Sequence, residues 1–470
     1  MVEFKSILFD QLTPIAIYQT IKKIYPDETT LLFESAINTS DGNFSFIFIG
    51  ERESIVHKNG KSFYKDEAGN RREIEKNPFI FLKKYYKSIE YEKYRELSKK
   101  AKVGFVDGFI GYVGYDMAKV FEPRLEPHMA NLKDELDMPD MKLIRPKITI
   151  AFSHKNNKLT IISEINDKLK HFGKIIDALS KPFSPTKLTK SKIDKDRGYF
   201  EFSKERFFSM VESAKEMIRS GDIFQIVLSN RFTQPCKIDK LSFYRILRSK
   251  NPSTYMYLMD YKNFSIVGSS PEVMVALKDN HILLRPIAGT RKRGDNIDRD
   301  LELELDMLND EKERAEHLML IDLGRNDVGR VAKVGSVKVK DMMRVERYSH
   351  VMHMVSDIEA VLDEKHDMFD LFASTFTAGT MTGTPKIRAM ELIADIEKLK
   401  RSYYSGVIGY FGFDGNLDSA IVIRTSYLDD NKIVFQAGAG IVADSKKELE
   451  YLEVQNKLQA LLSSLDELSE

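Results

Sequence analysis

Two pairs of glutamates are the first candidates for chemistry in this sequence. Each pair is spaced by three residues within a segment of helical periodicity: Glu313 with Glu316, and Glu450 with Glu453. Residues three apart lie on one face of a helix, so each pair presents two carboxylates in one direction. Oxygen ligands from two helices suit Mg²⁺, which keeps some waters and often binds a substrate carboxylate as well. The same spacing is common on solvated helix faces, so spacing alone leaves both interpretations open.

Two glycine-containing segments could bring backbone close to a ligand. PIAGTRKRG (286–294) and QAGAGIVAD (436–444) each end or follow a strand-like run. Glycine allows close approach of the backbone and exposes N–H groups to an anion. The second segment lacks the third glycine of a dinucleotide-binding motif, and no helix opens directly after it. For either segment alone, a tight turn between strands is an equally simple interpretation.

Four single residues are candidate acid, base or binding groups. Glu272 follows a Gly-Ser-Ser-Pro turn at the end of a strand, where acid/base residues often lie, although an exposed loop carboxylate fits too. His353 lies in an apolar run, where most histidines are satisfied core residues. Arg424 ends an apolar strand and is either a surface residue or a bidentate carboxylate clamp. Tyr404 alone indicates a core aromatic residue.

The sequence has no elbow of the Gly-x-Cys-x-Gly or Gly-x-Ser-x-Gly type. Its single cysteine, Cys236, lies in TQPCKID, which is not a nucleophile turn. We therefore expect no covalent glutaminase or hydrolase site in this chain.

The composition favours a globular enzyme that acts on small molecules. Lys and Arg (72) balance Asp and Glu (71), so no excess charge favours nucleic acid or an anionic membrane as a partner. No run approaches the ~20 apolar residues of a membrane span, and the start does not resemble a secretory signal. A single cysteine in 470 residues favours a reducing compartment. The predicted location is the cytoplasm.

The chain divides into three predicted regions: 1–180, a polar linker at 181–200 with two prolines, and 201–470. A helix should follow the linker, capped by Ser203 and stopped by Gly221. The region 201–470 alternates strand-like and helical segments, and HILLRPIAGT (281–290) and SAIVIRTSYL (419–428) are each predicted as one strand. This order predicts a mixed α/β (α+β) fold with a large, partly antiparallel sheet.

Taken in order, a series of segments resembles the chorismate-utilising enzyme family, and within it the component I (large, chorismate-binding subunit) branch of the anthranilate synthases. They cover residues 219 to 457 almost without a gap, and a looser match continues towards the N-terminus. The segments are SGDIFQIVLSNRF, GSSPE, RPIAGTRKRG, DEKERAEHLMLIDLGRND, HVMHMVS, TFTAGTMTGTPKIRAME, GVIGYFGFDGNLDSAIVIRT, QAGAGIVADSKKELEYLEVQNK and, more loosely, DQLTPIAIY, LLFESA and GFIGYVGYD.

The resemblance implies a fold of large, mostly antiparallel β-sheets packed face to face, with helices outside. It also implies a Mg²⁺-dependent reaction in which ammonia adds to C2 of chorismate, the C4 hydroxyl leaves, and pyruvate is then lost. By motif position, Glu272 would be the general acid and His353 would assist the loss of pyruvate. Glu316 and Glu453 would hold Mg²⁺, supported by Glu313 and Glu450. Chorismate would be bound by Gly289, Thr290, Tyr404, Arg424, Gly438, Ala439, Gly440 and Lys457.

Two positions discriminate between branches of the family. Relatives that add water carry a lysine as base where this chain has Gln225, and ammonia needs no such base. Aminodeoxychorismate synthases, which amine C4 instead, often have a nucleophilic lysine where this chain has Ala288. The two residues favour the amination of C2, with aminodeoxychorismate synthase as the alternative.

The resemblance further implies regulation and a partner. The family's tryptophan site uses two segments that correspond here to residues 32–35 and 251–256, with Ser35, Thr254, Tyr255 and Met256 as ligand contacts. Phe33 and Thr254 depart from the family pattern. The 1–180 region would then be regulatory and the 201–470 region catalytic. A glutamine amidotransferase subunit would supply ammonia, in a hetero-oligomer.

Overall fold

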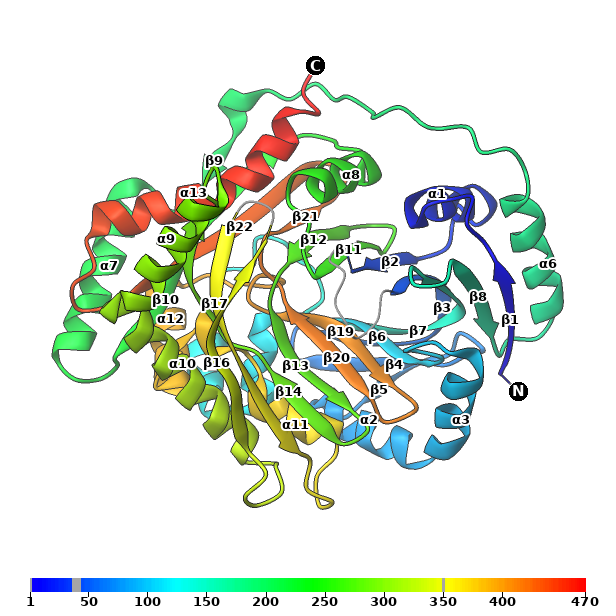
Figure 1. Cartoon of the computed structure of the whole chain (residues 1–470), viewed down its shortest axis with the longest axis horizontal. Helices are drawn as coiled ribbons and strands as arrows, with labels where there is room; N and C mark the ends of the chain where they lie inside the picture. The colour runs from blue at the N-terminus through cyan, green and yellow to red at the C-terminus, as the bar shows by residue number, and fades with distance from the viewer. Residues whose placement is uncertain (1, 36–43, 349–350) are drawn as a thin grey trace.

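The computed structural model of the chain describes residues 2–35, 44–348 and 351–470. Two of the matching segments reach beyond these ranges, at Ala36 and His350, which are therefore outside the described residues. The described strands form one hydrogen-bonded network that runs through both halves of the chain, with helices around it (Figure 1). The expected mixed α/β fold is confirmed.

The strands pair in long antiparallel ladders. β3 pairs with β7, β10 with β22, and β16 with β17. The strands are β1 Glu3–Leu8, β2 Thr30–Glu34, β3 Phe44–Lys58, β4 Lys61–Lys65, β5 Arg71–Ile74, β6 Gly108–Val113, β7 Met141–Ser153, β8 Lys158–Ser163, β9 Tyr199–Phe200, β10 Gln225–Pro235, β11 Tyr255–Asp260, β12 Ser265–Ser270, β13 Val273–Lys278, β14 His281–Leu284, β15 Ile287–Lys292, β16 Lys338–Arg347, β17 Val351–Val361, β18 Gly383–Thr384, β19 Val407–Gly412, β20 Leu417–Ile421, β21 Thr425–Leu428 and β22 Lys432–Ile441.

The helices cover the outside of the strand network. In Figure 1, α7, α9, α10 and α13 lie on one side of the molecule, and α1, α3 and α6 lie on the other. The α-helices are α1 Pro14–Ile24, α2 Pro78–Lys87, α3 Tyr91–Ala101, α4 Ala118–Phe121, α5 Glu126–Met129, α6 Lys168–Leu179, α7 Lys204–Arg219, α8 Lys240–Lys250, α9 Ile297–Asn309, α10 Glu311–Gly329, α11 Met368–Thr375, α12 Lys386–Glu397 and α13 Lys447–Asp466, with short 3₁₀ turns at Tyr115–Met117, Pro123–Leu125, Lys195–Arg197 and Gly379–Met381.

Local chemistry explains where the site helices begin. The Ser203 side chain accepts a hydrogen bond from the backbone N–H of Arg206, which caps α7 as the sequence predicts. Asp310 caps α10 in the same way, accepting from the N–H groups of Lys312 and Glu313. The cap fixes the first turn of α10, which carries Glu313, and Glu316 follows one turn later.

Two segments that the sequence predicts as single strands are each divided, so these predictions are wrong in detail. Residues 281–290 form β14 and the start of β15, separated at Arg285 and Pro286, because proline has no N–H for a ladder. Residues 419–428 form the end of β20 and then β21, separated around Arg424, whose φ is +49°. Arg424 is therefore not in a regular strand.

Strands of the two predicted regions pair directly with each other. β2 pairs with β11, and β6 pairs with β19. The division into 1–180, 181–200 and 201–470 remains a prediction about function. No helix among the described residues is long and apolar enough to pass through a bilayer.

Candidate active site

Six elements surround the candidate site. β10 and β22 pair side by side, β15 pairs with β17, and α10 and α13 carry the two glutamate pairs. Polar contacts and electrostatic effects link the sequence-predicted catalytic, chorismate and metal residues into one connected group. The predicted tryptophan residues form a separate group.

Glu272 is a buried carboxyl group in the short link between β12 and β13. Its Oε1 accepts a hydrogen bond from Thr380 Oγ1 at 2.8 Å. Burial raises the pKa of Glu272 to about 7, although Thr380, Arg424 and Lys457 each oppose the rise. About half of these groups therefore carry a proton near neutral pH, as a general acid requires.

His353 is buried in β17, and its ring is fixed at one nitrogen. Nδ1 lies 2.9 Å from the Gly289 carbonyl oxygen and 3.1 Å from Thr290 Oγ1. Because a carbonyl only accepts, Nδ1 carries the proton and Nε2 keeps its lone pair. Burial lowers the pKa of His353 to about 4, so the ring is a neutral base at physiological pH.

Arg424 supplies a cation beside these two groups. Its charge acts on the pKa values of both Glu272 and His353. No ion pair to its guanidinium occurs among the residues that the structure describes. Burial lowers the pKa of Arg424, and Glu272 and Tyr348 oppose this change. A half-buried guanidinium without a partner is suited to bind a substrate carboxylate.

The two glutamate pairs flank the same space. Burial raises the pKa of Glu316, and Glu313 raises it further. Burial likewise raises the pKa of Glu450, with a further contribution from Glu453. Lys312 and Lys457 lower both pKa values, so the same two cations lie near both pairs.

Three short contacts define the surroundings of the glutamates. Gln225 Nε2 donates to Glu316 Oε1 at 3.1 Å, and Arg291 Nη1 donates to Glu313 Oε1 at 3.0 Å. Lys457 Nζ forms an ion pair with Glu453 at 2.7 Å. The Glu453 side chain is 45% exposed and that of Lys457 is 52% exposed, so this side of the site opens to solvent.

As placed, no three His, Cys, Asp or Glu side chains in the described ranges form a closed metal site. The glutamates nevertheless suit a hard cation by their chemistry. Glu316 and Glu450 both have raised pKa values, which a divalent cation would lower. Gln225 Oε1 is a buried acceptor for which the described residues provide no donor. Mg²⁺ needs only a few protein oxygens because it retains water and binds substrate oxygens.

The glycine segments provide backbone surface next to these groups. Gly289 has a φ of +64°, at a register shift between β15 and β17, and an added Cβ would lie 3.4 Å from Glu313 Oε2. In β22, an added Cβ at Gly438 would lie 3.0 Å from the Tyr404 hydroxyl, and one at Gly440 would lie 2.8 Å from Gln225 Nε2. Lys457 Nζ donates to the Gly438 carbonyl at 2.9 Å. Ala439 between them is fully buried.

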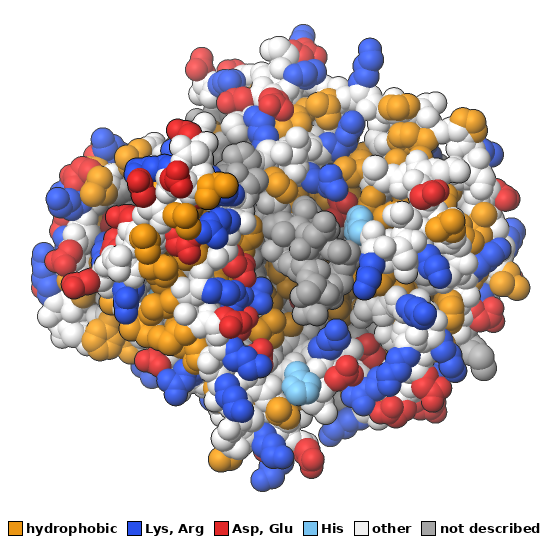
Figure 2. Space-filling view, viewed as in Figure 1, with side chains coloured by type: hydrophobic (Ala, Val, Ile, Leu, Met, Phe, Trp, Pro, Cys, Tyr) orange, Lys and Arg blue, Asp and Glu red, His pale blue; other side chains and the backbone are white. Residues whose placement is uncertain are grey.

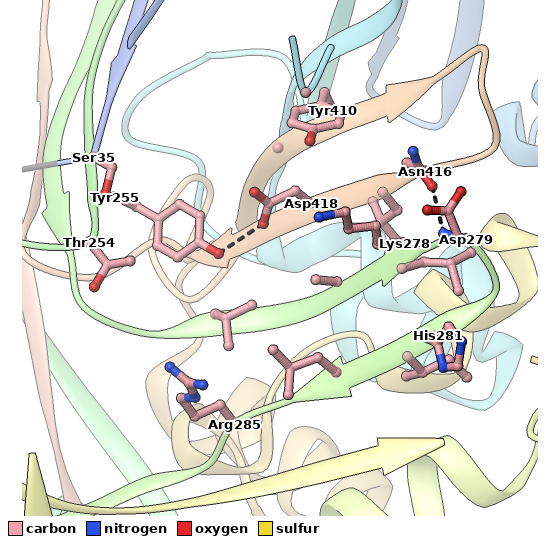
Figure 3. Close-up of a pocket in the computed structure, with 18 of the residues that line it drawn as sticks. Ser35, Thr254, Tyr255, Lys278, Asp279, His281, Arg285, Tyr410, Asn416 and Asp418 are labelled. Carbon is pink, nitrogen blue, oxygen red and sulfur yellow. Dashed lines mark hydrogen bonds between the residues drawn. The ribbon is translucent and has the colours of Figure 1, made fainter. Parts of the chain in front are cut away.

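The predicted tryptophan residues meet at a second cavity, of about 1270 Å³. Ser35, Thr254, Tyr255 and Met256 all line it, and the first three lie together at one end in Figure 3. The Tyr255 hydroxyl donates to Asp418 Oδ1 at 2.8 Å (Figure 3). Burial raises the pKa of Asp418, and the Tyr255 hydrogen bond opposes this.

Sequence reasoning missed two residues that touch site groups. Thr380 donates to Glu272, but it lies in a Gly-Thr-rich segment with no distinctive spacing. Tyr348 packs its ring edge-on against His353, with 5.6 Å between centroids, and its hydroxyl donates to Glu346 Oε2 at 2.8 Å. Tyr348 also lines the second cavity and therefore connects it to the catalytic group.

Comparison with known protein families agrees with this fold and this group of residues. Residues 28–463 match the family described as chorismate binding enzyme. The chain therefore belongs to the chorismate binding enzyme family.

Within that family, the chain is similar to component 1 of anthranilate synthase. It is 39% identical to that protein from Aquifex aeolicus (strain VF5), over 98% of this chain and 94% of the relative. It is 38% identical to that of Lactococcus lactis subsp. lactis (strain IL1403), over 98% of this chain and 99% of the relative.

Solved structures agree with this relationship. The crystal structure of anthranilate synthase component I from Streptococcus pneumoniae TIGR4 has a TM-score of 0.77 and 33% sequence identity, covering 90% of this chain and 93% of that chain. MenF, the menaquinone-specific isochorismate synthase from Escherichia coli, has a TM-score of 0.73 at 16% identity, covering 99% and 95% of the two chains, and shares the fold.

Proposed function

We propose that this chain is the chorismate-converting subunit of an anthranilate synthase, which makes anthranilate and pyruvate from chorismate and ammonia for tryptophan biosynthesis. The observation that carries the proposal is one connected site with a titratable buried acid, a neutral histidine and an arginine that forms no ion pair with the described residues. Glu272, His353 and Arg424 supply these groups. Similarity of 36–39% identity to anthranilate synthase component 1 proteins over nearly the whole chain supports the same activity.

Substrate binding rests on charge complementarity. Chorismate is a dicarboxylate, and Arg424 can bind one carboxylate through two parallel N–H donors. Gly289, Thr290, Gly438, Ala439 and Gly440 provide close backbone contact, and Tyr404 and Lys457 border the same surface. These eight residues form the proposed chorismate site.

Glu316 and Glu453, with Glu313 and Glu450 behind them, would hold Mg²⁺ at the open side of the site. When bound there, the ion would neutralise the ring carboxylate and fix the orientation of the substrate. The glutamates lie on α10 and α13, so the packing of two helices sets the separation of the pairs.

In the amination step, the nitrogen of ammonia forms a bond to C2, the C1=C2 double bond moves to C1=C6, the C5=C6 double bond moves to C4=C5, and the C4–O bond breaks. Hydroxide is a poor leaving group, so Glu272 gives its proton to the oxygen, which departs as water. The new ammonium group gives one proton to solvent and becomes a neutral amine. Gln225 has no basic nitrogen with which to deprotonate water, which is consistent with ammonia as the nucleophile.

In the elimination step, His353 Nε2 takes the ring proton from C2 while the C3–O bond breaks and pyruvate leaves as its enolate, which takes up a proton at its methylene carbon. The electron pair of the C–H bond completes the aromatic ring. The Gly289 carbonyl and Tyr348 hold the imidazole in the tautomer and orientation that this step needs.

Amination of C4, as in an aminodeoxychorismate synthase, is the alternative. Ala288 offers no nucleophile at the position where many of those enzymes have a lysine. The similarity to anthranilate synthase component 1 proteins also favours amination of C2.

The name of these relatives, component 1, implies a second component. We propose a glutamine amidotransferase subunit in a hetero-oligomer, because this chain has no glutaminase nucleophile turn. The predicted location is the cytoplasm, which the single cysteine favours.

The second cavity is the proposed regulatory site for tryptophan. Its apolar walls include Phe46, Met256 and Ile408, and its polar groups include Ser35 and Asp418. These groups suit an indole ring and an amino-acid backbone, respectively. The region 1–180 contributes β2, β3 and Ser35 to the wall, which supports its proposed regulatory role.

Incubation of the purified chain with chorismate, Mg²⁺ and ammonium tests the activity. We expect anthranilate fluorescence together with an equal amount of pyruvate. Consumption of chorismate to a 4-amino product that retains its enolpyruvyl group would instead establish the alternative.

A further inference from the structure

Asp327 and Lys386 form an ion pair inside the fold, each with a side chain that is 8% exposed. Lys386 Nζ donates to Asp327 Oδ2 and, at 3.3 Å, to the Thr375 carbonyl oxygen. Asp327 lies near the end of α10 and Lys386 at the start of α12. Burying two charges is costly, and an apolar pair of similar volume often gives equal or greater stability. Stability alone is therefore a weak reason for this pair, and the reaction steps above give it no role.

A small cavity, which we call the inner cavity, connects the ion pair with Glu272. Its volume is about 30 Å³, and its walls include Glu272, Thr380 and Asp327. A cavity of this volume holds a water molecule when two or more polar groups face it. Thr380 donates to Glu272, while no hydrogen bond reaches Asp327 Oδ1 in the part of the chain that the structure describes. A water in the inner cavity can therefore link the two carboxyl groups.

A wider cavity, which we call the outer cavity, lies on the other side of the ion pair. Its volume is about 260 Å³, and Lys386 lines it together with Arg330 and His366. Arg330 is exposed, so the outer cavity reaches solvent. Of these two cavities, Asp327 lines the inner one and Lys386 the outer one, so the ion pair separates them. The order from solvent inwards is the outer cavity, Lys386, Asp327, the inner cavity and Glu272.

We propose that Lys386 and Asp327 form a proton relay that returns a proton from solvent to Glu272 after each amination step. The inference rests on the proposed function, in which Glu272 gives its proton to the departing oxygen and is left as a carboxylate. Neither relay residue has to touch the substrate, because both act through Glu272. The relay reaches Glu272 from α10 and α12, so it can work while the intermediate still covers the chorismate site.

Each transfer in the relay moves one proton. The Lys386 ammonium group gives a proton to the Asp327 carboxylate, which leaves a neutral amine and a neutral carboxylic acid. The Asp327 carboxyl group rotates towards the inner cavity and gives this proton to the water there, and the water gives one of its own to the Glu272 carboxylate. The Lys386 amine then takes a proton from solvent in the outer cavity. The ammonium group formed on the intermediate releases one proton to solvent, so uptake and release balance.

Charged groups from several elements face the relay and Glu272. They are Arg330 near Asp327, Arg424 and Lys457 near Glu272, Arg285 in the wall of the inner cavity, and Glu122, His366 and Asp370 in the wall of the outer cavity. Burial nevertheless raises the pKa of Asp327 and that of Glu272, because it outweighs the nearby cations. A Glu272 carboxylate with a pKa of about 7 therefore takes up the returning proton at neutral pH.

The test removes both charges of the relay at once. Asp327→Asn combined with Lys386→Gln leaves no buried charge unpaired, and the two amides can still form a hydrogen bond. The matched control is Asp322→Asn on the same helix, at a side chain that is 73% exposed. Helix α10 lies on the outside of the molecule in Figure 1, and charged and apolar side chains are mixed over that area in Figure 2. The fold of each variant is checked by circular dichroism.

Rapid-quench measurement of chorismate consumption separates the first turnover from later ones. The enzyme is equilibrated below the pKa of Glu272, which is about 7, so that this group is protonated before chorismate, Mg²⁺ and ammonium are added. We expect the double variant to complete the first turnover at the wild-type rate and its steady-state rate to fall at least ~10-fold, because only later turnovers need the relay. The fall should be larger in D₂O, since proton transfer then limits the rate. Asp322→Asn should change neither rate.

Two kinetic outcomes would overturn the relay: an unchanged steady-state rate in the double variant, or equal slowing of the first and later turnovers, which indicates a structural role. A crystal structure of the wild-type chain tests the inner cavity without any variant. It should show a water within hydrogen-bond distance of both Glu272 and Asp327, and a dry inner cavity would also overturn the relay. Absence of anthranilate from the wild-type chain with chorismate, Mg²⁺ and ammonium would instead contradict the proposed function.

Discussion

Glu272 illustrates how surroundings give an ordinary side chain its chemistry. A solvated glutamate is ionised at neutral pH, but burial raises the pKa of this group to about 7. Its hydrogen bond from Thr380 and the nearby charge of Arg424 oppose the rise without cancelling it. Burial also disfavours the charged form of His353 on β17, and here it lowers the pKa, to about 4. Near neutral pH, one site thus holds an acid that is protonated in about half of the molecules and a base that is neutral.

The pH profile of amination tests the role of Glu272. The acid is active when protonated, so kcat should fall as pH rises through about 7. Glu272→Gln should lower kcat about 10²- to 10⁴-fold and remove this alkaline limb, since an amide has no acidic proton of that kind. The profile is measured with ammonium adjusted to keep free ammonia constant. A variant with wild-type kcat, or with the limb still present, would exclude Glu272 as the acid.

Among single residues, the sequence identified those that belong to motifs. It missed residues whose roles depend only on their neighbours in space. Glu272, His353 and Arg424 belong to recognisable segments, and the structure brings them together. Thr380 and Tyr348 have no such pattern, because a hydroxyl and a ring gain their roles only from what lies opposite them in space. A single sequence does not contain that information.

At the scale of elements, α10 and α13 form the metal side of the site. Each helix presents two glutamates at a spacing of three, as the sequence predicts, and the two pairs share Lys312 and Lys457 as neighbours. Gln225 at the start of β10 contacts Glu316 and fixes its orientation. Sequence spacing predicted the pairs, whereas their convergence depends on how the two helices pack.

Glu316→Gln tests this convergence. The substitution keeps the volume of the side chain and removes one charge, so the fold should persist while Mg²⁺-dependent activity is lost. We expect activity to fall, and the Mg²⁺ concentration for half-maximal rate to rise, at least ~10-fold. The control for the fold is circular dichroism: the variant should keep the spectrum and the thermal unfolding midpoint of the wild type. Wild-type dependence on Mg²⁺ in this variant would refute the assignment of Glu316.

The sequence predicted the helices of the site better than the ends of the strands. Apolar periodicity predicted α7, α10 and α13 well, because each has a buried stripe. The strands around Pro286 and Arg424 were predicted as continuous, since a proline or a residue with positive φ interrupts a ladder without altering the apolar pattern. The helix α9 was not predicted, although Ile297, Leu301 and Leu305 recur every four residues; these side chains face solvent rather than the core.

At the scale of the whole molecule, the two halves form one structure. β2 and β6 from the N-terminal region pair with β11 and β19 from the C-terminal region. Both pairings border the second cavity, so a ligand there touches strands that lead to Glu272 and, through Tyr348, to His353. This arrangement offers a direct physical route from an inhibitor to the catalytic groups.

Calorimetry with tryptophan tests the regulatory cavity. We expect binding heat with the wild-type protein, and binding at least ~10-fold weaker for Tyr255→Ala, because the ring of Tyr255 forms part of the wall. Ammonium-dependent activity without tryptophan should be retained. No binding heat at millimolar tryptophan, with chorismate binding intact, would refute the assignment of this cavity as the tryptophan site.

One site is proposed to carry out two successive reactions, with Glu272 acting in amination and His353 in the loss of pyruvate. His353→Ala separates them most directly when its reaction with chorismate, Mg²⁺ and ammonium is followed by mass spectrometry. We expect continued consumption of chorismate, slow release of pyruvate, and accumulation of an amino intermediate that retains its enolpyruvyl group. Normal consumption of chorismate with no such intermediate would contradict the proposal.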